Sequence, residues 1–155
     1  MSRASRRTVK FWVLAAPLAL VVVAMVSLPL ILNGLGLHPH FEGAALNLQG
    51  KRALIVTTSH DTLGDGGSAT GVFASEMTVP YYRFLDAGML VDVASIHGGA
   101  IPIEPVSLRW PVRTPEDRRF LADPDFQHKA TRSQRIDDVD FTAYDIVFLA
   151  GGWGA

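Results

Sequence analysis

Residues 51–88 read KRALIVTTSHDTLGDGGSATGVFASEMTVPYYRFLDAG, and they join an apolar strand to a helix. The run Ala53–Val56 is short and apolar, and polar residues bound it on both sides, which is typical of a strand buried on both faces of a parallel sheet. A glycine-rich loop over 64–71 follows, and Ser68 or Thr70 can cap the next helix. The stretch therefore predicts a strand, a loop and an α-helix, in that order.

Glu76 is predicted to lie on the inner face of this helix. Val72, Glu76 and Pro80 are four residues apart and share one face, and other apolar residues adjoin them: Phe73, Met77 and Phe84. The pattern predicts a carboxyl group that points the same way as the apolar side chains. Two interpretations remain open: a functional acid, and a buried structural acid bonded to the neighbouring backbone or to Ser75.

Pro80 lies inside the same predicted helix. Proline lacks the N–H that would bond to the carbonyl of Glu76, and its ring clashes with that carbonyl. We therefore expect a kink here, or a break with Pro80 at the first position of a second short helix.

The composition limits the class of protein. The 155 residues are 48% hydrophobic and have a formal net charge of -1, so the chain is not disordered by composition and is not charged enough to indicate nucleic-acid binding. It contains no cysteine. Disulfides and thiol chemistry are therefore excluded within these residues.

Residues 11–32 form an apolar run without a charged side chain. Such a run is long enough, at about 1.5 Å per residue, to cross a hydrocarbon core of roughly 30 Å. Because basic residues precede it, we expect a transmembrane anchor with residues 1–10 in the cytoplasm and the rest of the chain on the extracytoplasmic side. A cleavable signal peptide is the alternative, but the run is long for one and has no small-x-small site. Residues 33–50 are the expected linker, in which His38 and His40 lack a third ligand.

The later elements predict an α/β domain. Met89–Ser95 is a second apolar strand, and a strand, helix and strand joined this closely imply a parallel sheet. Thr114 can cap a helix that begins at Pro115 and ends near Ala122. Further predicted elements are a helical piece over 125–131 and a last strand over 144–150, before Gly151-Gly152.

Familiar ligand motifs are absent from the sequence. The glycines of 64–71 match neither the dinucleotide fingerprint nor a phosphate loop, so no cofactor is predicted. His60, His97 and His128 lack metal-ligand spacing among themselves, and we interpret them as ordinary loop histidines. No metal site is predicted.

Three separated stretches resemble the ThiJ/PfpI family, also called the DJ-one family, of the class I glutamine amidotransferase-like superfamily. They are 51–56 with Glu76 four residues before Pro80; 94–107 with Gly98-Gly99 and the segment PIEPVS; and 144–152. The second stretch is most similar to the branch of heat-shock chaperones and glyoxalase-III-type enzymes. The resemblance implies a flavodoxin-like parallel sheet with helices on both faces. It covers 51–155, so we expect an incomplete domain that corresponds to the first half of its relatives.

The resemblance also implies roles for two residues. Glu76 matches the family's glutamate, which is hydrogen-bonded to a reactive cysteine, and Gly152 matches the glycine whose N–H helps to form an oxyanion hole. The family's cysteine follows this turn, whereas the present chain has none, so we expect these 155 residues to be inactive by themselves. The resemblance implies that the complete form is a cysteine-dependent hydrolase or lyase on small carbonyl or amide substrates, with a homodimer as one open assembly. The alternative is a non-catalytic binding or chaperone-like module.

Overall fold

The computed structural model describes residues 15–28, 31 and 46–153. The chain divides into two units, Met1–Ala44 and Ala45–Ala155. In the first unit the structure describes a helix over 15–28. The second unit contains the sheet and all the elements discussed below.

The predicted membrane anchor over 11–32 is wrong. Among the helices of residues 15–28, 31 and 46–153, none combines the length and the apolar character that crossing a membrane requires. A helix needs about 20 consecutive apolar residues to span a bilayer, and in this part of the chain the structure describes residues 15–28 and residue 31 as helical. Residues 11–14, 29–30 and 32 lie outside the described residues, as do the predicted cytoplasmic segment 1–10 and positions 33–45 of the predicted linker.

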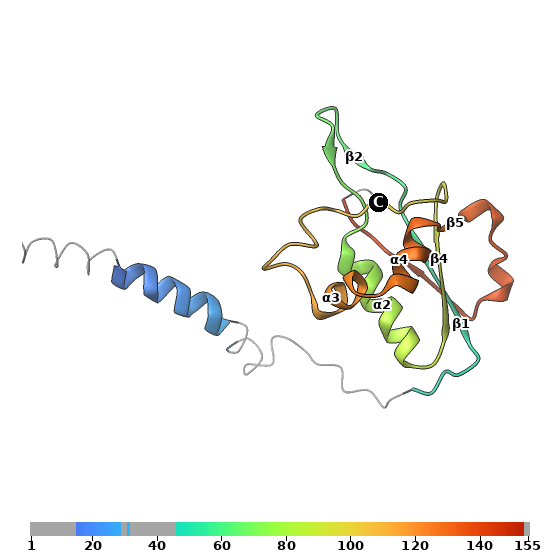
Figure 1. Ribbon diagram of the computed structural model, residues 1–155, viewed down its shortest axis with the longest axis horizontal. Helices are drawn as coiled ribbons and strands as arrows, with labels where there is room; N and C mark the ends of the chain where they lie inside the picture. Colours follow the sequence, from blue (N-terminus) through green and yellow to red (C-terminus); the bar gives the residue numbers. More distant parts are fainter. Residues whose placement is uncertain (1–14, 29–30, 32–45, 154–155) are drawn as a thin grey trace, which may run out of the picture. The chain divides into compact units, whose positions relative to one another are not determined.

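Four parallel strands form the main sheet, as predicted for an α/β domain. They are β1 Arg52–Thr57, β4 Leu90–Ser95, β5 Gln134–Arg135 and β6 Ile146–Leu149, in the spatial order β5-β4-β1-β6. A separate antiparallel hairpin, β2 Thr62–Leu63 with β3 Ser68–Ala69, projects from the sheet (Figure 1). The glycine-rich stretch that we predicted as a loop thus forms the turn of a short hairpin.

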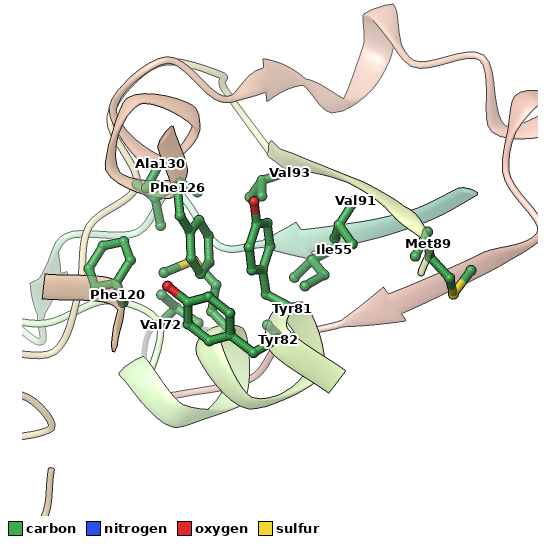
Figure 2. Close-up of a cluster of buried hydrophobic side chains, with 14 residues drawn as sticks. Ile55, Val72, Tyr81, Tyr82, Met89, Val91, Val93, Phe120, Phe126 and Ala130 are labelled. Atoms are coloured by element: carbon green, nitrogen blue, oxygen red, sulfur yellow. The ribbon is translucent and has the colours of Figure 1, made fainter. Parts of the chain in front are cut away.

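Three α-helices pack on one face of the sheet. They are α2 Ala74–Asp86, α3 Pro115–Leu121 and α4 Pro124–Thr131. Figure 2 shows Ile55, Val91 and Val93 of the sheet beside the aromatic side chains that the helices contribute: Tyr81, Tyr82, Phe120 and Phe126. The rings of Tyr81 and Phe126 stack with centroids 3.5 Å apart. This apolar layer is the main core of the unit.

The opposite face of the sheet has a smaller apolar cluster. Leu54, Val56 and Ala94 contact Ile136, Val139 and Tyr144, which lie in or next to the 3₁₀ turns η1 Ile136–Asp138 and η2 Phe141–Ala143. Helices on both faces were predicted, but within the described residues the α-helices of this unit cover one face only. On the uncovered side of the edge strand β6, Val147 is 43% exposed and Leu149 is 74% exposed.

The start of α3 follows the sequence prediction closely. The Thr114 hydroxyl accepts a hydrogen bond from the Asp117 N–H over 3.1 Å, and the Asp117 carboxylate accepts one from the Thr114 N–H over 2.7 Å. This reciprocal pair satisfies two backbone donors that a helix start leaves free. Asp117 is fully buried and also accepts a hydrogen bond from the Thr78 hydroxyl over 2.6 Å, which joins α3 to α2.

The helix α2 differs from its prediction in two respects. It runs without a break through Pro80, so of the two outcomes expected there, the break into a second short helix is wrong. Packing explains the continuity, because the buried side chains on both sides of the proline outweigh the loss of one backbone hydrogen bond. Neither Ser68 nor Thr70 caps the helix; instead the Ser107 hydroxyl accepts from the Ala74 N–H over 3.0 Å.

Candidate functional site

The end of β6 meets the start of α2. The Phe73 N–H donates to the Gly151 carbonyl over 3.1 Å. A Cβ atom on Gly152 would lie 2.6 Å from the carbonyl oxygen of Gly71 and 2.7 Å from the amide nitrogen of Phe73. Real Cβ atoms do not approach backbone this closely, so the contact requires glycine at 152. We call this contact between residues 71–73 and 151–152 the strand–helix junction.

The segment 102–107 holds the other side of residues 71–74. The Val72 N–H donates to the Pro102 carbonyl over 2.9 Å, and the Glu104 N–H donates to the Val72 carbonyl over 2.9 Å. The Ser107 hydroxyl donates to the Glu104 carbonyl over 2.6 Å while it accepts from Ala74. The first turn of α2 is therefore fixed from two sides, by β6 and by this segment.

Glu76 lies three residues beyond Phe73 of the strand–helix junction, in the first turn of α2. Its N–H donates to the Phe73 carbonyl over 2.9 Å, so two backbone hydrogen bonds connect Gly151, Phe73 and Glu76 in series. The side chain is exposed, and the prediction that it lies on the buried stripe is wrong. Within the described residues its carboxylate has no hydrogen bond or ion pair, so the suggested bond to Ser75 or to nearby backbone is not found either.

The buried stripe of α2 keeps Met77 from the prediction and otherwise consists of other residues. Its members are spaced three or four apart along the helix: Ala74, Met77, Thr78, Tyr81 and Tyr82. The sequence pattern favours the neighbouring stripe because Thr78 and Tyr82 carry polar atoms, but in the structure the hydroxyl group of each has a hydrogen-bond partner. The Tyr82 hydroxyl donates to Asp123 over 3.0 Å, for example.

Gly152, which is part of the junction, is half-buried. Its backbone N–H donates no hydrogen bond within the part of the chain that the structure describes. It lies three residues beyond the end of β6, whose parallel neighbour β1 ends at Thr57. The carboxyl ends of parallel strands are where α/β folds bind ligands. The structure thus places Gly152 in the junction and Glu76 three residues beyond it, at this end of the sheet.

A second feature at the same end of the sheet is an open pocket of about 210 Å³. It is lined by the residues that follow β1 and β4: Thr58, Ser59, His60, Asp61, Ile96 and His97. From the sequence, His60 and His97 are expected to be ordinary loop histidines. They converge because Thr57 pairs with Ser95 in the parallel register, so both strands leave the sheet at the same level.

The described residues include no group of three or more His, Asp or Glu side chains placed to hold a metal ion. His38 and His40 lie outside the described residues. Two pKa shifts in this unit have a clear physical cause. Burial raises the pKa of Tyr81 to about 12, and the hydrogen bond from Lys51 lowers the pKa of Asp145.

Comparison with known proteins identifies the domain through its structure. No family model matches the chain, and no curated protein sequence matches it. The Rapid Encystment Protein 24 kDa of Francisella tularensis is 39% identical with a TM-score of 0.60, and the match covers 66% of this chain and 44% of that one. Glyoxalase III of Candida albicans is 26% identical with a TM-score of 0.58, and the match covers 67% of this chain and 44% of that one.

The present chain thus spans less than half the length of these two proteins. The matches cover about two-thirds of this chain. The three stretches that resemble the ThiJ/PfpI family lie within residues 51–155, which is a similar share of the chain. Together, these similarities and motifs show that the chain contains a ThiJ/PfpI-like domain over about two-thirds of its length.

Proposed function

We propose that this domain contributes an acid, Glu76, and an oxyanion donor, the Gly152 N–H, to a cysteine-dependent active site for small carbonyl or amide substrates. The observation that carries the proposal is the strand–helix junction. Two backbone hydrogen bonds, of 3.1 and 2.9 Å, connect Gly151 to Glu76 through Phe73. The two backbone segments that carry the acid and the donor are therefore joined directly, and such fixed positions favour preorganised catalysis.

The chemistry assigns each group a simple role. A thiolate would add to the carbonyl carbon of the substrate, so a sulfur–carbon bond forms while the electron pair of the C=O π bond moves to oxygen. The Gly152 N–H would donate to that oxygen, and the Glu76 carboxyl group would transfer a proton to or from the reacting atoms. The 155 residues contain no cysteine, so the thiol would come from polypeptide outside them. The name of the similar Candida protein, glyoxalase III, favours carbonyl compounds over amides.

A non-catalytic binding or chaperone-like module is the second candidate. The exposed apolar side of β6, with Val147 and Leu149, favours it because such a surface can hold an extended apolar segment of another chain. The absence of a thiol within these residues is compatible with both candidates. An activity measurement separates them.

The test is a chimaera in which residues 46–153 replace the matched region of the Francisella protein and are followed by the rest of that protein. Methylglyoxal, a small 2-oxoaldehyde, serves as the substrate. We expect turnover, and we expect Glu76→Gln to lower kcat/KM by about 10² to 10⁴, the usual contribution of a general acid or base. Asp125→Asn is the matched control, because Asp125 is also an exposed acid in the first turn of a helix.

Two results would contradict the proposal. If Glu76→Gln and the unsubstituted chimaera turn over methylglyoxal equally, Glu76 has no part in the reaction. If the cysteine-free chain of 155 residues is itself active, the thiol mechanism is wrong. An inactive but folded chimaera that binds unfolded polypeptide would favour the second candidate.

A further inference from the structure

The pocket between the ends of β1 and β4, which we call the histidine pocket, has side chains that no structural role requires. Its lining residues His60, Asp61 and His97 are exposed. Within the described residues, the two imidazole rings have no hydrogen bond or ion pair. Exposed imidazoles that share a pocket without a partner are available to a ligand.

Backbone contacts hold the walls of the histidine pocket in place. The His97 N–H donates to the Ser59 hydroxyl oxygen over 2.8 Å, which joins the turn after β4 to the turn after β1. The His60 N–H donates to the Thr58 hydroxyl oxygen over 2.9 Å. The Asp61 carbonyl accepts from the Thr70 N–H over 2.9 Å. In each contact the donor is a backbone N–H, and the acceptor is a hydroxyl or a backbone carbonyl. The contacts therefore do not depend on the two imidazoles.

The side chains of the pocket define a chemical class of ligand. The Ser59 hydroxyl oxygen accepts from the backbone N–H of His97, so its own hydrogen can still be donated to a ligand. Each neutral imidazole also offers one N–H. The pocket is therefore rich in donors for a carbonyl oxygen. The Asp61 carboxylate accepts from the Thr62 hydroxyl over 2.7 Å and has further lone pairs for a ligand hydroxyl. With neutral histidines, Asp61 is the only formal charge among the lining residues, and it disfavours an anion.

We propose that the histidine pocket binds a small neutral hydroxy-carbonyl compound, with the carbonyl oxygen at His60 and His97 and the hydroxyl at Asp61. The volume of about 210 Å³ lies below the roughly 300 Å³ at which pockets for drug-sized ligands begin, so a ligand of a few heavy atoms fits. The proposal rests on the proposed function in one respect: it makes this pocket the binding site for the non-reacting end of a carbonyl substrate, at the same end of the sheet as the strand–helix junction.

The test measures binding and needs no turnover. The 155-residue chain, labelled with ¹³C in its histidines, is titrated with hydroxyacetone, and the imidazole Cε1–H signals are followed by NMR. We expect the His60 and His97 signals to shift along one saturating curve with a dissociation constant in the millimolar range, as for other ligands of this size. The signal of His128, an exposed histidine on α4, should not shift.

Variants then test the individual contacts. His60→Gln and His97→Gln should each weaken binding by about tenfold, the effect of one lost hydrogen bond, whereas His128→Gln should not change it. Glycolate keeps the hydroxyl but carries a carboxylate, which Asp61 repels, so it should bind more weakly than hydroxyacetone. Asp61→Asn should reduce the difference in dissociation constant between the two ligands. Amide spectra check that the variants keep the fold.

Several outcomes would overturn the inference: no saturable shift at His60 and His97, an equal shift at His128, or tighter binding of glycolate than of hydroxyacetone to the unsubstituted chain. Its failure can be distinguished from that of the proposed function. If hydroxyacetone binds but the chimaera is inactive, the catalytic proposal fails alone. If the chimaera is active but hydroxyacetone does not bind, the pocket assignment fails alone.

Discussion

The amide nitrogen of Phe73 lies 3.1 Å from the carbonyl oxygen of Gly151, and this hydrogen bond joins the end of the last strand to the first turn of α2. The two residues are far apart in the sequence. The close packing of Gly152 against residues 71–73 accompanies the bond. Any change that separates these backbones should therefore affect both stability and the position of Glu76.

Gly152→Ala should destabilise the fold. The added Cβ would lie 2.6 Å from the Gly71 carbonyl oxygen, so backbone must move, which typically costs about 1 to 3 kcal/mol. Gly151→Ala is a matched control because a Cβ there meets nothing within 4 Å. Urea unfolding measures both free energies of unfolding. If the free energy of unfolding falls by the same small amount in both variants, the close approach of Gly152 to residues 71–73 is not present in solution.

Ser107→Ala should remove the cap of α2. The Ser107 hydroxyl is buried and accepts the Ala74 N–H over 3.0 Å, and loss of such a cap typically costs about 1 kcal/mol. Ser68→Ala is the control, because Ser68 is the exposed residue that the sequence offered as the cap. Thermal unfolding measures the loss of stability in each variant, and we expect the larger loss in Ser107→Ala. A larger loss in Ser68→Ala would restore the prediction from sequence.

Asp145→Asn should reduce the loss of stability in acid. The Asp145 carboxylate accepts hydrogen bonds from the Lys51 ammonium and the Arg52 N–H, each over 2.8 Å, and these lower its pKa below the ordinary value of 3.8. A carboxyl group whose pKa is lower in the folded state adds stability above its unfolded pKa, and this stability is lost as the pH falls through the folded pKa.

The free energy of unfolding between pH 6 and pH 2 should therefore fall less steeply in Asp145→Asn than in the unsubstituted chain. Lys51→Met, which removes the larger of the two causes, should flatten the profile in the same direction. Three profiles of equal slope would show that the contact has no effect on folding.

Leu149→Glu should reduce self-association of the chain. Leu149 is 74% exposed on the edge strand β6, and an exposed apolar edge strand is prone to pair with another molecule. Leu63→Glu, on the projecting hairpin where Leu63 is 39% exposed, is the control and should have a smaller effect. Sedimentation velocity measures the distribution of species. If the unsubstituted chain is monomeric at high concentration, β6 is not an association surface.

Features that depend on adjacent residues could be predicted from the sequence. The strands β1 and β4 were found because each is a short apolar run between polar residues, and the Thr114 capping box depends on contacts only three residues apart. The family-like stretches placed these elements in the right fold. The prediction of a membrane anchor is wrong, because within the described residues no helix is long and apolar enough to cross a membrane, and an uncharged run alone does not establish such a helix.

Features that depend on tertiary contacts could not be predicted. Which stripe of α2 is buried depends on what packs against it, and two tyrosines with Thr78 form the inner face while Glu76 is exposed. The meeting of His60 and His97 depends on the register between β1 and β4. The roles of Glu76 and Gly152 stay predictions, because the family resemblance assigns them and the structure supplies only their positions.

The cap of α2 also has a consequence for the order of folding. Ser107 lies 33 residues beyond the Ala74 whose N–H it accepts, so this cap can form only after the intervening chain has closed a loop, which delays such contacts. By contrast, Thr114 caps α3 from three residues away. We therefore expect α3 to have a defined start early in folding. The first turn of α2, which contains Glu76, should become ordered only when the segment 102–107 docks.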